Sequence, residues 1–406
     1  MDYLIILTLL LTPTYALRFN LFGFSTNFLM MWVVFVWLIF VLVFTAKHEW
    51  QNFFNFIKNF DKKILILTGL FFLAGLISLS VKSFDQKKIG QFIVLFLQPV
   101  SIFFIAGFTI KQKSSAKSLL LTTCYLLLAV MGLYSILQYF TLLGLPPMWW
   151  GNSVEPKRAI AFWSHPNFYA LFSAPLLAFL IPDALKEFSI FLPSLRLWRT
   201  GNFQFSKIIK PLLWLIGAVG LLLSLSRAGW LGLGVAGLIY LFIAAEKKVR
   251  RFASVFVIVI IIVIVSIPNL RWRFVLPFYG EKSAVSRLSL WNTGVKAIKE
   301  APIVGLGLTG FAKQWPRLNT DPNLDSHNFP HNIFLDLWVE TGIIGLISLI
   351  GLMGLMIFRG LNNRADIFKL GASLFLIALL TQGFIDNPYF KNDLAMVFWI
   401  ILSLAI

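Results

Sequence analysis

The stretch Pro330-His331-Asn332 opens a long apolar run, and Gly342-Ile343-Ile344-Gly345 follows the His-Asn pair after nine residues, 333–341. The rest of the chain consists mainly of similar apolar runs joined by short polar gaps. The segment 268–330, directly before the His-Asn pair, is the only sizeable hydrophilic piece. A polar pair therefore stands where a mostly hydrophobic chain meets its largest polar segment, and we expect the functional site there.

The composition indicates a membrane protein. Of the 406 residues, 58% are hydrophobic and 13% are charged, and the mean hydropathy is +0.82. A soluble domain carries about 25% charged residues, and one water-soluble core cannot enclose this much apolar surface. The chain has one cysteine, Cys124, which lies within an apolar run. Because there is only one, the chain forms neither an intrachain disulfide nor a thiolate metal site.

The apolar runs predict an all-α integral membrane protein with about twelve transmembrane helices. Each run is about 15–27 residues long, close to the ~20 residues that span a bilayer. Residues 1–17 carry Asp2 and no basic residue before their apolar part, unlike a signal peptide, so we interpret them as a short first helix. Further helices are expected at 28–46, 64–80, 91–110, 118–143, 167–181, 208–225, 228–245, 252–267, 332–358, 368–385 and 394–406.

The net charge of +18 does not indicate nucleic-acid binding, because the basic residues fall in the gaps between apolar runs. There they mark topology and meet anionic lipid headgroups. With a cytoplasmic N-terminus, 19 Lys and Arg residues fall in cytoplasmic gaps and eight in short external gaps, which places both termini in the cytoplasm. The segment 268–331 is then one large external loop inserted into a single polytopic membrane domain, 1–406.

Within the external loop, residues 284–300 match an amphipathic helix. Leu288, Trp291, Val295 and Ile298 share its apolar stripe. The glycine-rich stretch 305–310 has the spacing G-x-G-x-x-G but lacks the strand–turn–helix context of a dinucleotide site. We therefore predict a tight external loop, in which glycines supply positive φ angles.

The predicted orientation brings the conspicuous polar residues to the external side. Arg227 interrupts an apolar run, 208–245, that is too long for one span, so the chain turns there. An arginine at membrane depth costs about 2.5–3.5 kcal/mol on translocon scales and usually faces a cavity or a partner. Its planar guanidinium suits phosphate oxygens. The simpler alternatives are a snorkelling Arg227, a solvated Arg287, a helix-capping His165 and a turn Asp386.

His331 is one of four histidines, and a lone histidine is often a capping or packing residue. Its place at an external helix entrance, after several basic residues, favours a general base or a hydrogen-bond donor. No second His or carboxylate lies at metal-ligand spacing, and no Asp-x-Asp pair is present to bind a metal–nucleotide. We therefore predict neither a metal nor another cofactor.

These motifs together resemble those of the O-antigen ligase and O-antigen polymerase family. The His331-Asn332 pair, nine further residues and Gly342-x-x-Gly345 resemble the hallmark of that family. Arg227 after an apolar run, Arg287 in the external loop, and the segment 158–167 resemble its other landmarks. The resemblance covers about residues 150–390, and it implies a fold of about twelve helices with one large periplasmic loop.

The resemblance implies an O-antigen ligase-like glycosyltransferase of the bacterial inner membrane. Such an enzyme moves a glycan from undecaprenyl diphosphate to a hydroxyl of a lipid or glycan acceptor at the periplasmic face, without metal or nucleotide. The site residues implied are Arg227, Arg287 and Arg158 on the diphosphate, His331 on the acceptor hydroxyl, and His165, Asn332 and Asp386 in support.

Ligase and polymerase share all of these motifs, and both remain open. Some relatives have been linked to inorganic-carbon uptake, so a transporter is the alternative of another class. A transporter typically has two repeated halves with broken helices at the midplane, and no such repeat is evident here. A structural scaffold would leave the arginines unexplained.

Overall fold

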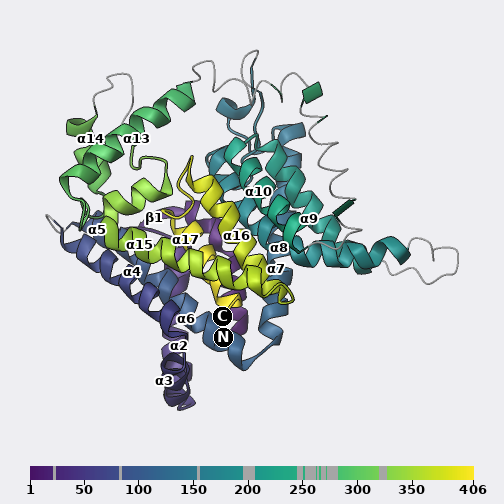
Figure 1. Ribbon diagram of the computed structural model, residues 1–406, viewed down its shortest axis with the longest axis horizontal. Coiled ribbons are helices and arrows are strands. Elements are labelled where there is room, and N and C mark those ends of the chain that lie inside the picture. The colour runs from purple at the N-terminus through teal and green to yellow at the C-terminus, as the bar shows by residue number, and fades with distance from the viewer. Residues whose placement is uncertain are drawn as a thin grey trace. The chain divides into compact units, whose positions relative to one another are not determined.

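The computed structural model describes residues 1–21, 24–81, 85–152, 156–194, 206–244, 250–251, 262, 265–266, 271, 282–319 and 327–406. Helices dominate this part of the chain, because a helix satisfies its own backbone hydrogen bonds and therefore suits a lipid environment. Within it, six helices are long and apolar enough to cross a membrane (Figure 1). They are Phe28–Ala46, Lys62–Ser80, Gln86–Gln112, Ser115–Thr141, Pro166–Phe188 and Ile333–Asn362.

Most helices start and end within a few residues of the predicted apolar runs. The elements are α1 (Asp2–Leu10), η1 (Thr12–Ala16), β1 (Arg18–Leu21), β2 (Phe24–Asn27), α2 (Phe28–Ala46), α3 (Trp50–Lys58), α4 (Lys62–Ser80), α5 (Gln86–Phe92), η2 (Ile93–Leu97), α6 (Gln98–Gln112), α7 (Ser115–Thr141), η3 (Pro147–Trp149), α8 (Pro166–Ser194), α9 (Ser206–Leu223), α10 (Arg227–Ile243), α13 (Lys282–Glu300), α14 (Gly310–Leu318), α15 (Ile333–Asn362), α16 (Ile367–Gly383) and α17 (Asn392–Leu404).

Two predicted helices need comment. Residues 1–17 do not form one span: α1 has nine residues, about 14 Å of helix, and η1 with its proline at position 13 follows. After η1 the chain forms an antiparallel hairpin, β1 with β2, which the hydrophobic pattern did not predict. The predicted helix 252–267 lies largely outside the described residues, as does the start of the external loop.

The described residues divide into two units. Unit 1 contains residues 1–123, 286–358 and 383–406. Its centre is the packing of α17 along α6, where the rings of Trp399 and Phe103 lie 5.1 Å apart. Phe71 of α4 packs on both Trp399 and Tyr389. Because these aromatic side chains are fully buried, α4, α6 and α17 form one apolar core.

The two ends of α6 distinguish the two ends of unit 1. Lys113, just after α6, forms an ion pair with Asp2 at 3.3 Å, and the side chain of Ile406 also reaches this end. At the other end, the Tyr389 hydroxyl donates to the carbonyl of Leu95 at 2.7 Å. These ends are about 26 Å apart at 1.5 Å per residue. Both termini therefore lie at one end, and the loop before α17 lies at the other.

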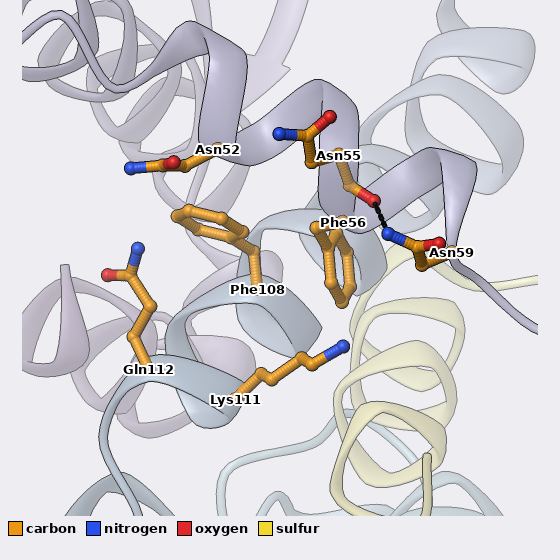
Figure 2. A pocket seen from close by; sticks show the side chains of 7 residues that line it. All are labelled: Asn52, Asn55, Phe56, Asn59, Phe108, Lys111 and Gln112. Atoms are coloured by element: carbon orange, nitrogen blue, oxygen red, sulfur yellow. Dashed lines mark hydrogen bonds between the residues drawn. The ribbon is translucent and has the colours of Figure 1, made fainter.

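A pocket of about 250 Å³ lies at the terminal end of unit 1, between α3 and the last turn of α6. Figure 2 shows amide side chains and one lysine around the Phe108 ring. The lining residues are Asn52, Asn55, Phe56, Asn59, Phe108, Lys111 and Gln112. Because it adjoins the Gln112 end of α6, this pocket is distant from the loop before α17.

Unit 2 contains residues 124–285 and 359–382. Its helix α8 packs against α9 and α10, and small residues at the contacts allow the close approach that helices in lipid require. A side chain at Gly229 would meet Ala170 of α8, and one at Gly232 would meet the carbonyl of Ala378 in α16. The amide of Gln382 also donates to the Ala170 carbonyl at 3.0 Å.

Helix α15 is broken at Gly342, whose φ of 70° and ψ of −175° are not helical. The segment between α13 and α14 enters this break. The amide of Ile343 donates to the Pro302 carbonyl at 3.2 Å, and the amide of Leu306 donates to the Val339 carbonyl at 2.7 Å. The backbone groups that the break leaves without helical partners are thus satisfied by this segment.

The glycine-rich stretch before α14 forms the predicted tight loop. Gly305 and Gly307 have φ angles of 73° and 83°, values that favour glycine. A Cβ at Gly305 would lie 2.6 Å from the Val339 carbonyl, and one at Gly307 would lie 2.8 Å from the Ser78 carbonyl. The loop therefore approaches α15 and α4 more closely than any side chain allows.

Helix α13 is confirmed, and of its predicted apolar stripe Ile298 packs against the cluster shared with α14. Leu290, Thr293 and Ala297 are buried, whereas Leu288 and Val295 are 59% and 42% exposed. Leu290 and Ala297 form one apolar cluster with α14. Small residues such as Ala297 allow α14 to approach, and a stripe chosen by hydrophobicity alone identified only part of this face.

Candidate functional site

The imidazole of His331 lies against a buried carboxylate in unit 1. Its Nδ1 is 2.8 Å from Oδ1 of Asp386, and the two side chains are 30% and 5% exposed. The φ of His331 is 54°, a conformation that is uncommon outside glycine and occurs often at functional sites. When Nδ1 carries the proton, the carboxylate accepts a hydrogen bond from Nδ1–H and Nε2 presents a lone pair. The pair can therefore act as an oriented base.

Asn332 holds the backbone next to His331. Its Oδ1 accepts from the amides of Phe334 and Leu335 at 3.0 and 3.1 Å, as an N-cap of α15 does. Its Nδ2 donates to the Phe384 carbonyl at 3.1 Å. Asn332 thus ties the start of α15 to the chain that leads into Asp386, which is the supporting position that the sequence predicts.

Arg287 of α13 also reaches this place. Its Nε donates to the Ile385 carbonyl at 2.9 Å. Burial alone raises the pKa of Asp386, but the hydrogen bond and charge of His331 and the charge of Arg287 lower it to about 2. Asp386 therefore stays anionic. The guanidinium of Arg287 is bonded to the backbone of Ile385, the residue just before Asp386.

Other polar residues at this site were not identified from the sequence. The side chain of Asn387 donates to a carboxylate oxygen of Asp336 on α15. Burial lowers the pKa of Lys391 to about 8, and the charges of Asp393 and Asp386 oppose this shift. A sequence signal for Asp336 did exist, because ionisable residues inside membrane helices are rare and usually functional or paired.

The other predicted arginines lie in unit 2. The Nε of Arg158 donates to the Ser224 carbonyl at 2.9 Å, and its Nη2 donates to Oδ1 of Asn167 at 2.8 Å. Its guanidinium also lies 5.6 Å from the Trp149 ring centre. Arg227 is the first residue of α10 and is half-buried. Arg158 is therefore bonded to the same turn that carries Arg227.

His165 directly precedes α8. Its Nδ1 accepts from the amide of Asn167 at 3.1 Å, and its ring packs edge-on against Trp149 at 4.7 Å. This geometry is that of a side chain capping a helix start, which is the simpler of the two predicted roles.

The predicted residues thus form two groups. Arg287, His331, Asn332 and Asp386 form a connected cluster in unit 1, which we call the His331 cluster. In unit 2, Arg158 is bonded to the Arg227 turn and to Asn167, which contacts His165. Among the described residues, no group of three or more His, Cys, Asp or Glu side chains is arranged to hold a metal ion.

The comparisons with known proteins agree with the motif resemblance. No curated protein matches the chain. Residues 212–350, which include Arg227, Arg287, His331 and Asn332, match the family model described as O-antigen ligase. This match supports an assignment of the segment 212–350 to the O-antigen ligase family.

Proposed function

We propose that the chain is a glycosyltransferase that moves a glycan from undecaprenyl diphosphate to an acceptor hydroxyl at the outer face of the bacterial inner membrane. The family acts on lipid-linked glycans. The observation that carries the finer proposal is the His331 cluster, in which an imidazole, a buried carboxylate and a guanidinium meet at the start of a membrane helix. Ligase-like transfer is the first choice, and polymerase activity of the same family is the alternative.

In the proposed reaction the acceptor oxygen attacks the anomeric carbon of the glycan. The bond from that carbon to the diphosphate breaks, and its electron pair leaves with the diphosphate. His331 accepts the hydroxyl proton on Nε2 while Asp386 stabilises the imidazolium through Nδ1. Arg287 stabilises the charge that grows on the departing diphosphate. The diphosphate is a good leaving group, so the scheme assigns no role to a metal ion.

Arg227 and Arg158 are proposed as further diphosphate ligands. Guanidinium groups supply several N–H donors in a plane, which suits phosphate oxygens. The Nε and Nη2 bonds of Arg158 hold its guanidinium at the Arg227 turn. Three points support the proposal for Arg158 and Arg227: the turn that they share, the ability of guanidinium to bind phosphate, and the family motif. His165 is proposed to position this loop by capping α8.

We propose a periplasmic location for the His331 cluster and a cytoplasmic location for both termini. The geometry of unit 1 supports opposite sides, because Asp2 and Ile406 lie at one end of α6 and Tyr389, just after Asp386, lies at the other. The charge bias of the loops assigns the termini to the cytoplasm. The same proposal keeps about twelve spans in a single membrane domain with 268–331 as its external loop.

Purified protein with a polyprenyl-diphosphate glycan and candidate acceptors tests the proposal. His331→Ala and Arg287→Ala should each lower transfer by at least about 100-fold, because each removes a group needed in the transition state. His48→Ala is the control, since His48 lies between α2 and α3. Normal transfer by both site variants would refute the proposed mechanism.

The same assay separates the two alternatives. A single addition to a lipid acceptor indicates a ligase, whereas progressive growth of the glycan chain indicates a polymerase.

A further inference from the structure

Helix α15 carries two carboxylates that the proposed reaction does not use. Asp336 and Glu340 are four residues apart, so they lie on one face of the helix, and both are fully buried. Ionisable residues inside membrane helices are costly to bury and usually have partners or functions. Each of these two carboxylates bonds a different segment next to the His331 cluster: Asp336 bonds Asn387, and Glu340 bonds the start of α14.

Asp336 holds the turn that presents Asp386. One of its carboxylate oxygens accepts from the side-chain amide of Asn387. The backbone amide of Asn387 in turn donates to Oδ1 of Asp386 at 2.9 Å, and its Oδ1 accepts from the amides of Tyr389 and Phe390 at 3.2 Å each. Asn387 is therefore the centre of this turn, and Asp336 fixes Asn387 to α15.

Glu340 holds the start of α14. Its Oε1 accepts from the amide of Phe311 at 3.2 Å, and the amides of Thr309 and Gly310 interact with the same carboxylate. These amides begin α14, where the helix dipole favours a negative charge. The positive charge of Lys88, itself buried, also acts on Glu340. A carboxylate of the membrane helix thus serves as the anchor for the start of α14.

The anchor extends to Arg287. Helix α14 packs on α13 through one apolar cluster that includes Leu290, Ala297, Phe311 and Trp315. Leu290 lies three residues after Arg287 on α13. Displacement of α14 from α15 would therefore move the helix that carries Arg287, whereas the turn with Asp386 has its own tie to Asp336.

We propose that Asp336 and Glu340 are positioning residues with separate effects: Asp336 aligns Asp386 with His331, and Glu340 places Arg287. The proposal rests on the function proposed above. It predicts that loss of the Asp336 bond slows the chemical step, because the base loses its orientation. Loss of the Glu340 bond weakens binding of the diphosphate donor, because Arg287 is displaced.

Kinetics of purified protein in lipid nanodiscs, with the polyprenyl-diphosphate glycan concentration varied, tests the two effects. Asp336→Leu should lower kcat about tenfold or more with donor KM close to that of the parent. Glu340→Leu should raise donor KM about tenfold or more with a smaller change in kcat. A role limited to stability would give both variants the same kinetic profile, and that result would overturn the proposal.

Conservative exchanges sharpen the test. Asp336→Asn and Glu340→Gln keep an oxygen that accepts the same hydrogen bonds, so they should recover most of the parent activity. Asn387→Leu should lower kcat as much as Asp336→Leu does. The double variant should show no further loss of kcat, because both substitutions remove the same hydrogen bond between Asn387 and Asp336. A further independent loss in the double variant would contradict the shared bond.

Two comparisons keep the outcome interpretable. If Asp336→Leu is not recovered folded, Asn387→Leu takes its place. If Glu340→Leu is not recovered folded, Glu340→Asp takes its place. Glu340→Asp withdraws the carboxylate by one methylene and should still raise donor KM, and an unchanged KM would count against the proposal.

If His331→Ala keeps full transfer, the proposed function fails. If His331→Ala is inactive while Asp336→Leu and Glu340→Leu have parent kinetics, the positioning proposal alone fails.

Discussion

Gly342→Ala is the substitution that tests most directly how the segment between α13 and α14 joins α15. The residue has φ 70° and ψ −175°, a region that only glycine occupies readily. Forcing another residue into such a conformation costs about 1–3 kcal/mol. A Cβ would in addition overlap the carbonyl oxygen of Ile303, which is backbone and has little freedom to move. We therefore expect a loss of at least about 2 kcal/mol in unfolding free energy.

Gly354→Ala is the matched control on the same helix. A Cβ at Gly354 meets nothing within 4 Å, and the residue has helical geometry. Alanine is favoured over glycine in a helix by about 0.5–1 kcal/mol, so this variant should be as stable as the parent or more stable. Denaturant unfolding of both variants in detergent measures the difference. If Gly342→Ala unfolds like Gly354→Ala, the break at Gly342 is not required and our account of the junction is wrong.

Three further predictions concern the surroundings of His331. Asn332→Ala removes the cap of α15 and should cost about 0.5–2 kcal/mol of stability, measured by denaturant unfolding; an unchanged midpoint would contradict the capping role. Because the pKa of Asp386 is lowered from its ordinary 3.8 to about 2, its ionised form stabilises the fold above about pH 4, and this contribution of about 2 kcal/mol is lost as pH falls toward 2. Asp386→Asn should flatten thermal stability across that window, and an unchanged slope would refute the charge pairing. Burial lowers the pKa of Lys391 from 10.5 to about 8, so the unfolded chain binds more protons between these values and stability should rise with pH there. Lys391→Met should abolish that rise, and a rise that persists would show that another group causes it.

The sequence predicted most of the described helices, because a long apolar run in lipid satisfies its own backbone hydrogen bonds by forming a helix. It failed at residues 1–17, where the nine-residue helix α1 is followed by the proline-containing η1 instead of continuing as one span. For α13 it identified the helix but only part of the face that packs. Ile298 of the apolar stripe packs against the cluster shared with α14, whereas Leu288 is exposed and the buried contacts come from Leu290 and Ala297. Hydrophobicity detects a helix more reliably than it detects the partner of that helix.

The candidate site was predictable only in part. Motif spacing identified His331, Asn332 and Arg287 as candidates, and the structure places all three near Asp386. The bond between Asp336 and Asn387 joins residues 51 positions apart. No local pattern encodes such a pairing. Asp336 lies five residues after His331 and does not share its helix face, yet it reaches the same site through the Asp386 turn.

Glu340 of α15 also explains how the segment between α13 and α14 is held to this helix. Within lipid the hydrophobic effect does not drive helices together, so close packing and polar contacts must do so. Glu340 meets the start of α14, and Ser78 of α4 donates to the Glu340 carbonyl at 2.8 Å. The break at Gly342 supplies backbone partners for the same segment. Glu340 and Gly342, two residues apart on α15, therefore act on one junction, and the effects of Glu340→Leu and Gly342→Ala on stability should be less than additive. Additive losses in the double variant would show that the two contacts hold the segment independently.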